Sequence, residues 1–224
     1  MTATPATREV SERGEVQIRA GSVLLSGELK VPAHATGIVL FAHGSGSSRH
    51  SPRNQYVARV IRDAGVGTLL FDLLTREEET VDNYTREFRF DINLLAQRLV
   101  AATNWLAGEN ETNKLRPGYF GASTGGGAAL VAAAELGVKV GAVVSRGGRP
   151  DLAGEALRHV KAPTLLIVGG LDGPVIRMNE EAYDELRGLK ELKIIPGATH
   201  LFKEPGKLEE VASLAAKWFL KHLQ

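Results

Sequence analysis

Apolar residues along this chain fall into short runs separated by segments with helical spacing, which indicates alternating strands and helices. The first two runs, 15–20 and 23–31, alternate loosely between apolar and polar positions around Gly21-Ser22, a pattern that predicts a β-hairpin. The run at 37–42 is continuous, as is typical of a buried parallel strand. Further strands are predicted at residues 67–71, 115–120, 138–145, 164–169 and 192–195.

Helices are predicted between these strands. They cover residues 52–64, 88–106, 126–136, 151–158, 175–189 and 207–223. Pro52 follows Ser51 at the start of the first one, as expected for the first turn of a helix. The segment 126–136 is mostly alanine and glycine, which lets a helix pack closely on a sheet. The acidic stretch 75–87, in contrast, is expected to be a solvated loop.

This alternation predicts an α/β architecture. Right-handed crossovers would give a mostly parallel central sheet with helices on both faces, preceded by the N-terminal β-hairpin. The connections are short, and no insertion is long enough to form a cap domain. Residues 1–14 are polar and are expected to form a flexible N-terminal segment, whereas residues 15–224 are expected to form a single domain.

The composition of the chain argues against several classes of function. The chain has 224 residues, a net charge of +1 and 43% hydrophobic residues, so nothing indicates a nucleic-acid or acidic-membrane partner. No apolar run approaches the roughly 20 residues needed to span a bilayer. The first residues lack the apolar segment of a secretory signal, so a cytoplasmic location is expected.

Cysteine is absent, which excludes disulfides, cysteine metal ligands and a cysteine nucleophile. The histidines show no paired metal-binding spacing, so neither a metal nor another cofactor is expected. The oligomeric state is left open by the sequence.

Chemically active residue types gather where the predicted strands end. The segments 41–46, 121–125, 168–173 and 196–200 all follow strands, and ligands bind at the carboxyl ends of strands in such sheets. Ser123 lies between Gly121 and Gly125, at a sharp turn from a strand to a helix. This is the context in which a nucleophilic serine is held.

A serine nucleophile needs a base, and the base needs a carboxylate to orient it. Ser123, Asp172 and His200 follow three of these strand ends, in the chain order nucleophile, acid, histidine. Asp151 and Asp72 also follow strands, but Asp172 comes after the penultimate strand, where the acid is expected. An oxyanion hole would then use the backbone N–H of Thr124 and that of Ser45.

These motifs resemble the α/β-hydrolase superfamily, in particular its small, cap-less members related to dienelactone hydrolase. The resemblance covers about residues 15–223 and rests on His-Gly-Ser-Gly at 43–46, Gly-Ala-Ser-Thr-Gly at 121–125, Gly-Gly-Leu-Asp at 169–172 and Gly-Ala-Thr-His at 197–200. Dienelactone hydrolases use a cysteine nucleophile, whereas position 123 is serine. The resemblance therefore implies an ester or thioester hydrolase acting on a small molecule. The alternatives are a peptidase or other acyl transferase, and a non-catalytic binding protein on the same fold.

Other charged residues near the predicted site allow two interpretations. Arg146 and Arg149 follow a strand, and arginine forks bind carboxylates or phosphates, so both are candidate substrate-binding residues. The alternative is that they form salt bridges with nearby acids such as Asp151 or Asp72. His43 is expected to support the backbone of its loop rather than to act as a base.

Overall fold

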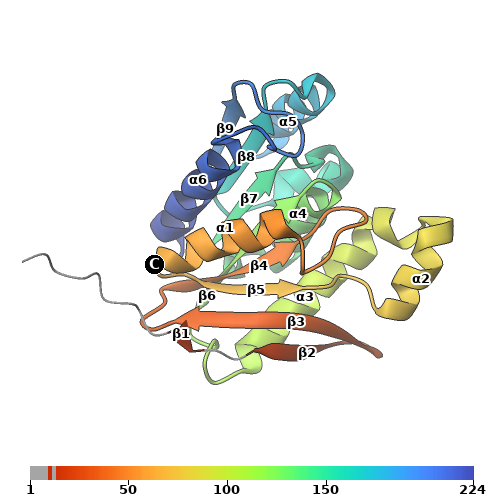
Figure 1. Cartoon of the computed structure of the whole chain (residues 1–224), viewed down its shortest axis with the longest axis vertical. Coiled ribbons are helices and arrows are strands. Elements are labelled where there is room, and N and C mark those ends of the chain that lie inside the picture. The colour runs from red at the N-terminus through yellow and green to blue at the C-terminus, as the bar shows by residue number, and fades with distance from the viewer. Residues whose placement is uncertain (1–9, 12–13) are drawn as a thin grey trace, which may run out of the picture.

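A nine-stranded sheet forms the centre of the described part of the chain, which comprises residues 10–11 and 14–224 of the computed structural model (Figure 1). The strands are β1 (Val10–Ser11), β2 (Glu15–Ala20), β3 (Val23–Pro32), β4 (Gly37–Ala42), β5 (Gly67–Phe71), β6 (Arg116–Ala122), β7 (Ala142–Arg146), β8 (Thr164–Gly169) and β9 (Lys190–Ile195). Their order is β1-β3-β5-β4-β6-β7-β8-β9, with β2 also paired to β3. Neighbours from β5 to β9 are parallel, whereas β3 is antiparallel to β1, β2 and β5.

The helices pack on both faces of this sheet. They are α1 (Pro52–Asp63), α2 (Arg76–Thr85), α3 (Ile92–Gly108), α4 (Thr124–Leu136), α5 (Gly173–Glu185) and α6 (Lys207–His222), with 3₁₀ segments η1 (Phe88–Phe90), η2 (Gly137–Lys139) and η3 (Pro150–His159). One apolar core joins the sheet to α3, α4, α5 and η3. The other core joins it to α1 and α6.

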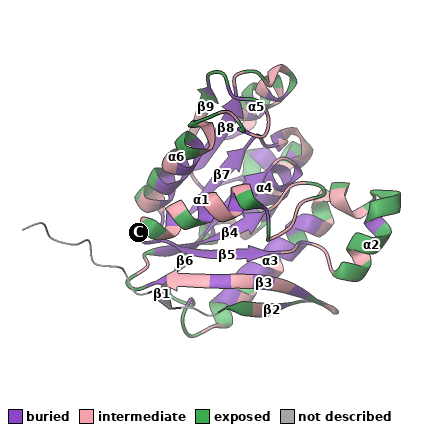
Figure 2. Cartoon of the chain, viewed as in Figure 1, coloured by how far each residue is buried: buried purple, intermediate pink, exposed green. Residues whose placement is uncertain are grey.

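Strand β4 shows why its apolar run is continuous. Ile38, Leu40 and Ala42 belong to the first core, whereas Val39 and Phe41 belong to the second. Side chains alternate across a strand, so covering both faces requires apolar residues at every position. The interior strands are accordingly buried along their length, and exposed residues lie on the outer sides of the helices (Figure 2).

The predicted mostly parallel sheet, the N-terminal hairpin and the lack of a cap domain are confirmed. The predicted flexible segment 1–14 lies largely outside the described residues. Within it, Val10 and Ser11 form β1, with Val10 opposite Pro32 on β3.

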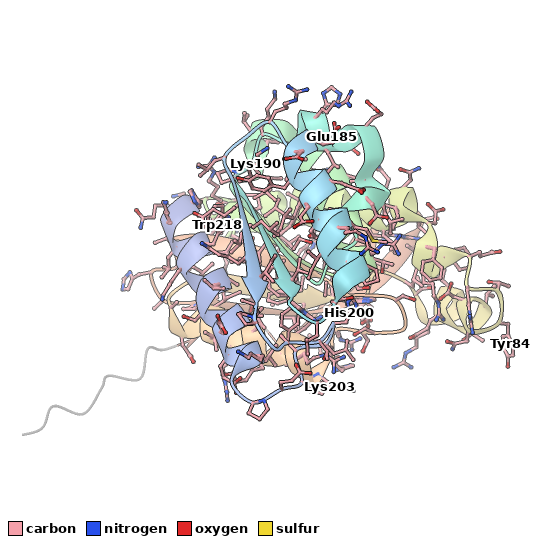
Figure 3. The ribbon with its side chains drawn as sticks, turned by 90° about the horizontal axis from the view of Figure 1, so that it is seen from above. Tyr84, Glu185, Lys190, His200, Lys203 and Trp218 are labelled. Carbon is pink, nitrogen blue, oxygen red and sulfur yellow. The ribbon has the colours of Figure 1, made fainter. Side chains whose placement is uncertain are left out.

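The predicted loop at 75–87 is wrong, because residues 76–85 form α2. Thr75 and Glu78 make a capping box, in which the Thr75 hydroxyl accepts from the Glu78 N–H and the Glu78 carboxylate accepts from the Thr75 N–H. Asp82 is the one residue of α2 that is buried. Tyr84 is 88% exposed and projects away from the rest of the molecule (Figure 3).

Three other predicted boundaries also shift. The helix predicted from residue 88 begins at Ile92, because the Asp91 carboxylate accepts from the Leu94 N–H and caps it there. The strand predicted at 138–145 begins only at Ala142 and runs to Arg146, and 137–139 form η2. The helix predicted at 151–158 is the 3₁₀ segment η3, interrupted at Gly154.

Candidate active site

The carboxyl ends of β4, β6, β7, β8 and β9 lie along one edge of the sheet. Ala42 pairs in register with Gly121, and Ala122 with Arg146. All the predicted site residues lie at these strand ends or shortly after them, so the fold places them along this edge. Figure 3 shows His200 in the loop beyond β9, near the start of α5.

Ser123 has a strained backbone. Its φ of 51° and ψ of −123° are rare for a residue with a side chain, and such strain costs about 1–3 kcal/mol. The turn is held by its own hydrogen bonds, because the Ser123 carbonyl accepts from the N–H groups of Gly126 and Arg149, both at 2.9 Å. The structure therefore fixes the Ser123 side chain at the junction of β6 and α4.

Glycine is required on both sides of this turn. A Cβ at Gly121 would lie 2.5 Å from the Gly125 carbonyl oxygen. A Cβ at Gly125 would overlap the carbonyl oxygen of Ala42, at the end of β4. The Gly-x-Ser-x-Gly pattern thus reflects close approach of three backbone segments.

His200 and Asp172 are hydrogen bonded. The His200 Nδ1 atom lies 2.6 Å from Asp172 Oδ2. Asp172 is the residue before α5, yet its side chain makes no capping bond to that helix. The competing aspartates are engaged elsewhere, since Asp151 pairs with Arg149 and Asp72 with Arg49. Of the three carboxylates, the structure brings Asp172 to the histidine.

The imidazole of His200 also lies beside the serine turn. A Cβ at Gly147 would be 3.5 Å from both Nδ1 and Cε1 of His200. Gly147 directly follows Arg146, whose carbonyl accepts the N–H of Ser123 at 3.3 Å. Two consecutive residues therefore lie between the serine turn and the histidine: Arg146 bonds the turn, and Gly147 lies beside the imidazole.

The two predicted oxyanion donors are adjacent. Thr124 is the first residue of α4, so its N–H is one of those that a helix leaves without an intrahelical acceptor. The N–H of Ser45 donates to the Thr124 hydroxyl at 3.0 Å. Sequence analysis missed this side-chain role, although a hydroxyl directly after the candidate nucleophile was visible in the sequence.

His43 supports its loop, as predicted. Its Nε2 accepts from the Leu73 N–H at 3.1 Å, so the ring proton is on Nδ1, which contacts the Gly44 carbonyl at 3.1 Å. Burial lowers the pKa of His43, which favours the neutral ring that this pair of bonds requires.

The two candidate substrate-binding arginines differ. Arg149 makes a two-pronged ion pair with Asp151, with Nε and Nη2 at 2.9 and 2.7 Å from its carboxylate oxygens, and this bonding raises the pKa of Arg149. Arg146 is only 5% exposed and bonds the Asn54 side chain at 3.2 Å. Burial, with a smaller effect of Arg53, lowers the pKa of Arg146 to about 10. Within the described residues, no carboxylate contacts Arg146.

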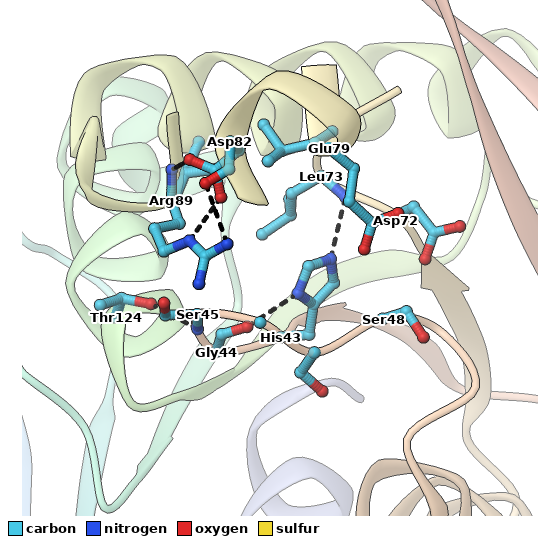
Figure 4. Close-up of a pocket in the computed structure, with 14 residues that line it drawn as sticks. His43, Gly44, Ser45, Ser48, Asp72, Leu73, Glu79, Asp82, Arg89 and Thr124 are labelled. Atoms are coloured by element: carbon cyan, nitrogen blue, oxygen red, sulfur yellow. Dashed lines mark hydrogen bonds and ion pairs between the residues drawn. The ribbon is translucent and has the colours of Figure 1, made fainter. Parts of the chain in front are cut away.

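A pocket of about 450 Å³, including space open to solvent, lies beside the Ser45 loop under α2 (Figure 4). Thr124, Leu73, Leu95 and Arg89 are among its lining residues. Arg89 forms an ion pair with the buried Asp82 of α2. Burial opposes ionisation of Asp82, but hydrogen bonds from Arg89 prevail and lower its pKa. Sequence analysis missed this pocket because it missed α2.

Two kinds of feature are absent from the described residues. No helix there is long and apolar enough to cross a membrane. In the same residues, no group of three or more histidine, aspartate or glutamate side chains is arranged to hold a metal ion.

The sheet order and strand-end loops define an α/β-hydrolase-fold protein. The chain belongs to the dienelactone hydrolase family, whose sequence profile matches residues 25–224. A dienelactone hydrolase from Anabaena variabilis, known from its crystal structure, is 63% identical in sequence to this chain. The match covers 96% of this chain and 99% of the other, with a TM-score of 0.94.

More distant structures show the fold alone. An α/β serine hydrolase without a lid from Xanthomonas campestris is 20% identical over 94% of this chain and 95% of that one, with a TM-score of 0.75.

The curated relatives are longer proteins. A putative phosphoribosyl transferase of Mycobacterium tuberculosis, found in two strains, is 60% identical over 209 residues, which is 93% of this chain but 46% of the relative. The chain thus spans about half the length of the curated relatives it matches, and their name applies to the longer protein.

Proposed function

We propose that this protein is a serine hydrolase that cleaves small carboxylic esters or thioesters through an acyl-enzyme. Ser123 is the nucleophile, His200 the general base and Asp172 the residue that orients the base. The observation that carries the proposal is the 2.6 Å contact between His200 Nδ1 and Asp172 Oδ2, at the sheet edge that holds Ser123 in its strained turn.

The contact determines which nitrogen does the chemistry. Because Nδ1 donates its proton to Asp172, the Nε2 atom of His200 is the unprotonated nitrogen and accepts the hydroxyl proton of Ser123. The Ser123 oxygen attacks the acyl carbon and forms a tetrahedral intermediate. His200 then returns the proton to the leaving group, and a water activated by the same nitrogen releases the acyl group.

Negative charge develops on the substrate oxygen during this attack. The backbone N–H groups of Thr124 and Ser45 are proposed to stabilise it, because they lie on the two segments that meet beside Ser123. A Cβ at Gly44 would be 3.1 Å from the Cβ of Ser123, which shows how close the Ser45 loop comes to the nucleophile.

The two arginines have different expected roles. Arg149 is already neutralised by Asp151, which favours a role in holding its loop. Arg146 retains the capacity to bind an anionic substituent, because no carboxylate in the described part of the chain neutralises it. Small or flexible esters suit this site better than long-chain lipids, since no cap domain provides a buried apolar tunnel.

Active-site labelling tests the proposal. A fluorophosphonate probe should modify the wild-type protein at Ser123, located by mass spectrometry of the digest, and should not modify Ser123→Ala. A panel of p-nitrophenyl esters and acyl thioesters should show turnover that Ser123→Ala lowers about 10⁴- to 10⁶-fold with an unchanged melting temperature.

Two outcomes would contradict the proposal. A label on a different serine would show that the nucleophile is misassigned. No label and no turnover, in a protein with a normal melting temperature, would favour the non-catalytic binding protein on the same fold.

A further inference from the structure

The Thr124 hydroxyl lies where the two proposed oxyanion donors meet. It belongs to the residue whose N–H is one donor, and it accepts the other donor, the Ser45 N–H, at 3.0 Å. Thr124 is only 3% exposed and begins α4, directly after Ser123. The dashed contact between Thr124 and Ser45 is visible at the edge of the pocket in Figure 4.

The contact with Ser45 leaves the hydroxyl proton of Thr124 available for donation. A threonine hydroxyl offers one donor and two acceptor lone pairs, and towards Ser45 it acts as acceptor. No acceptor for its proton is found among the described residues. Threonines in helices commonly donate to the carbonyl four residues earlier, but that residue, Phe120, is in β6 and not in the helix. Thr124 also lines the pocket.

We propose that the Thr124 hydroxyl is a third donor to the oxyanion, which makes Thr124 a catalytic residue through its side chain as well as its backbone. This inference rests on the proposed function. In the free protein the hydroxyl aligns the Ser45 N–H of a partly exposed loop. When Ser123 attacks, the hydroxyl donates its proton in a hydrogen bond to the substrate oxygen.

No covalent bond to Thr124 forms or breaks in this step. The Ser123 oxygen bonds to the acyl carbon, the electron pair of the carbonyl moves to its oxygen, and the Ser123 proton moves to His200. The substrate oxygen then accepts from the Thr124 N–H and hydroxyl, and the Ser45 N–H is shared between that oxygen and the Thr124 hydroxyl.

Thr124→Val tests this role because valine has nearly the same shape and lacks the hydroxyl. With a neutral p-nitrophenyl acetate we expect kcat to fall about 100-fold, with KM changed less than about 3-fold, as for loss of one oxyanion donor. Thr124→Ser restores the hydroxyl without the methyl group, so it should recover kcat to within about tenfold of wild type.

Thr103→Val is the matched control. Thr103 is also a buried threonine, and its hydroxyl bonds the Leu99 carbonyl and the Tyr119 hydroxyl in α3 and β6, away from the site. This variant should lower the melting temperature and leave kcat unchanged. The comparison separates loss of a buried hydroxyl from loss of a donor at the oxyanion.

A boronic acid adduct of Ser123 distinguishes donation from simple alignment of Ser45. Its tetrahedral oxygen mimics the oxyanion, so proton NMR of the adduct should show a slowly exchanging hydroxyl proton on Thr124 that is missing in the Thr124→Val adduct. A hydroxyl that only aligns Ser45 would leave its own proton without an acceptor and exchanging rapidly.

Three results would overturn the inference. One is a kcat of Thr124→Val equal to or above wild type while fluorophosphonate still labels Ser123. The second is a Thr124→Ser variant as impaired as Thr124→Val, which would show that the methyl packing matters. The third is failure of wild-type Ser123 to label at all, which removes the proposed function and this inference with it.

Discussion

Replacing Asp172 with asparagine keeps the shape of the side chain and changes one property, the ability to accept the His200 Nδ1 proton. The carboxylate lies 2.6 Å from Nδ1 and makes no capping bond to α5. An asparagine amide would donate to Nδ1 and thereby place the imidazole proton on Nε2, where it prevents acceptance of the Ser123 proton. We expect kcat to fall about 10⁴-fold, which is about 5.5 kcal/mol of transition-state stabilisation.

Stability should change much less than catalysis in this variant. The His200 side chain is 38% exposed and that of Asp172 14% exposed, so solvent screens the pair and it contributes at most about 1 kcal/mol to folding. The melting temperature should therefore move by a few degrees at most, about what 1 kcal/mol causes in a domain of this size. A large activity loss with a small stability loss is the expected signature.

Asp151→Asn is the matched control, because Asp151 also follows a strand and is engaged by Arg149 instead of by histidine. The assay is steady-state hydrolysis of p-nitrophenyl acetate, with melting followed by circular dichroism. The reasoning would be refuted if Asp172→Asn retained near wild-type kcat, and most clearly if Asp151→Asn were the inactive one of the two.

Three further predictions concern His43, the arginines and Gly125. Burial lowers the pKa of His43 below its ordinary 6.5, so the folded protein binds a proton there less readily than the unfolded chain. The free energy of unfolding should therefore decline as the pH falls from 7 to 5. His43→Asn should have a lower urea midpoint at pH 7 and a shallower decline, and parallel declines would contradict this assignment. Arg146→Gln should raise KM for a succinate monoester about ten- to a hundredfold while leaving an acetate ester nearly unchanged, since a charge-assisted contact is worth about 1.5–3 kcal/mol. Arg149→Gln should affect both esters alike and lower the melting temperature, and an anion-selective effect there would reverse the two roles. Gly125→Ala should lower stability by about 1–3 kcal/mol in chemical denaturation and slow fluorophosphonate labelling, because the new methyl group overlaps the Ala42 carbonyl. Unchanged stability would contradict the close contact between position 125 and the Ala42 carbonyl.

Most of the sheet could be predicted because burial on both faces leaves a pattern within each strand's own sequence. A strand such as β4 is covered on both faces, so it must be continuously apolar, and that run is visible without any partner. The pairing of Asp172 with His200 was also predictable, because the order of strand ends in such a sheet restricts which loops can meet.

The segment 75–91 could not be predicted from apolar spacing, because α2 buries almost nothing apolar. The cue that was available is the pairing of Thr75 with Glu78 at its start. The ion pair of Glu78 with Arg98 of α3, and the contact of Thr124 with Ser45, depend on partners far apart in the sequence that only the folded chain brings together.

The way α2 is attached has a consequence for how substrate range can change in proteins built on this plan. Neither apolar core contains a residue of α2, and the helix is held by two ion pairs, one from Asp82 to the neighbouring Arg89 and one from Glu78 to Arg98 of α3. The strand ends that position Ser123, Asp172 and His200 are fixed independently by the sheet. Mutations in residues 75–91 can therefore remodel one wall of the pocket without disturbing the proposed catalytic residues. Evolution or protein engineering could exchange this segment and keep the proposed reaction.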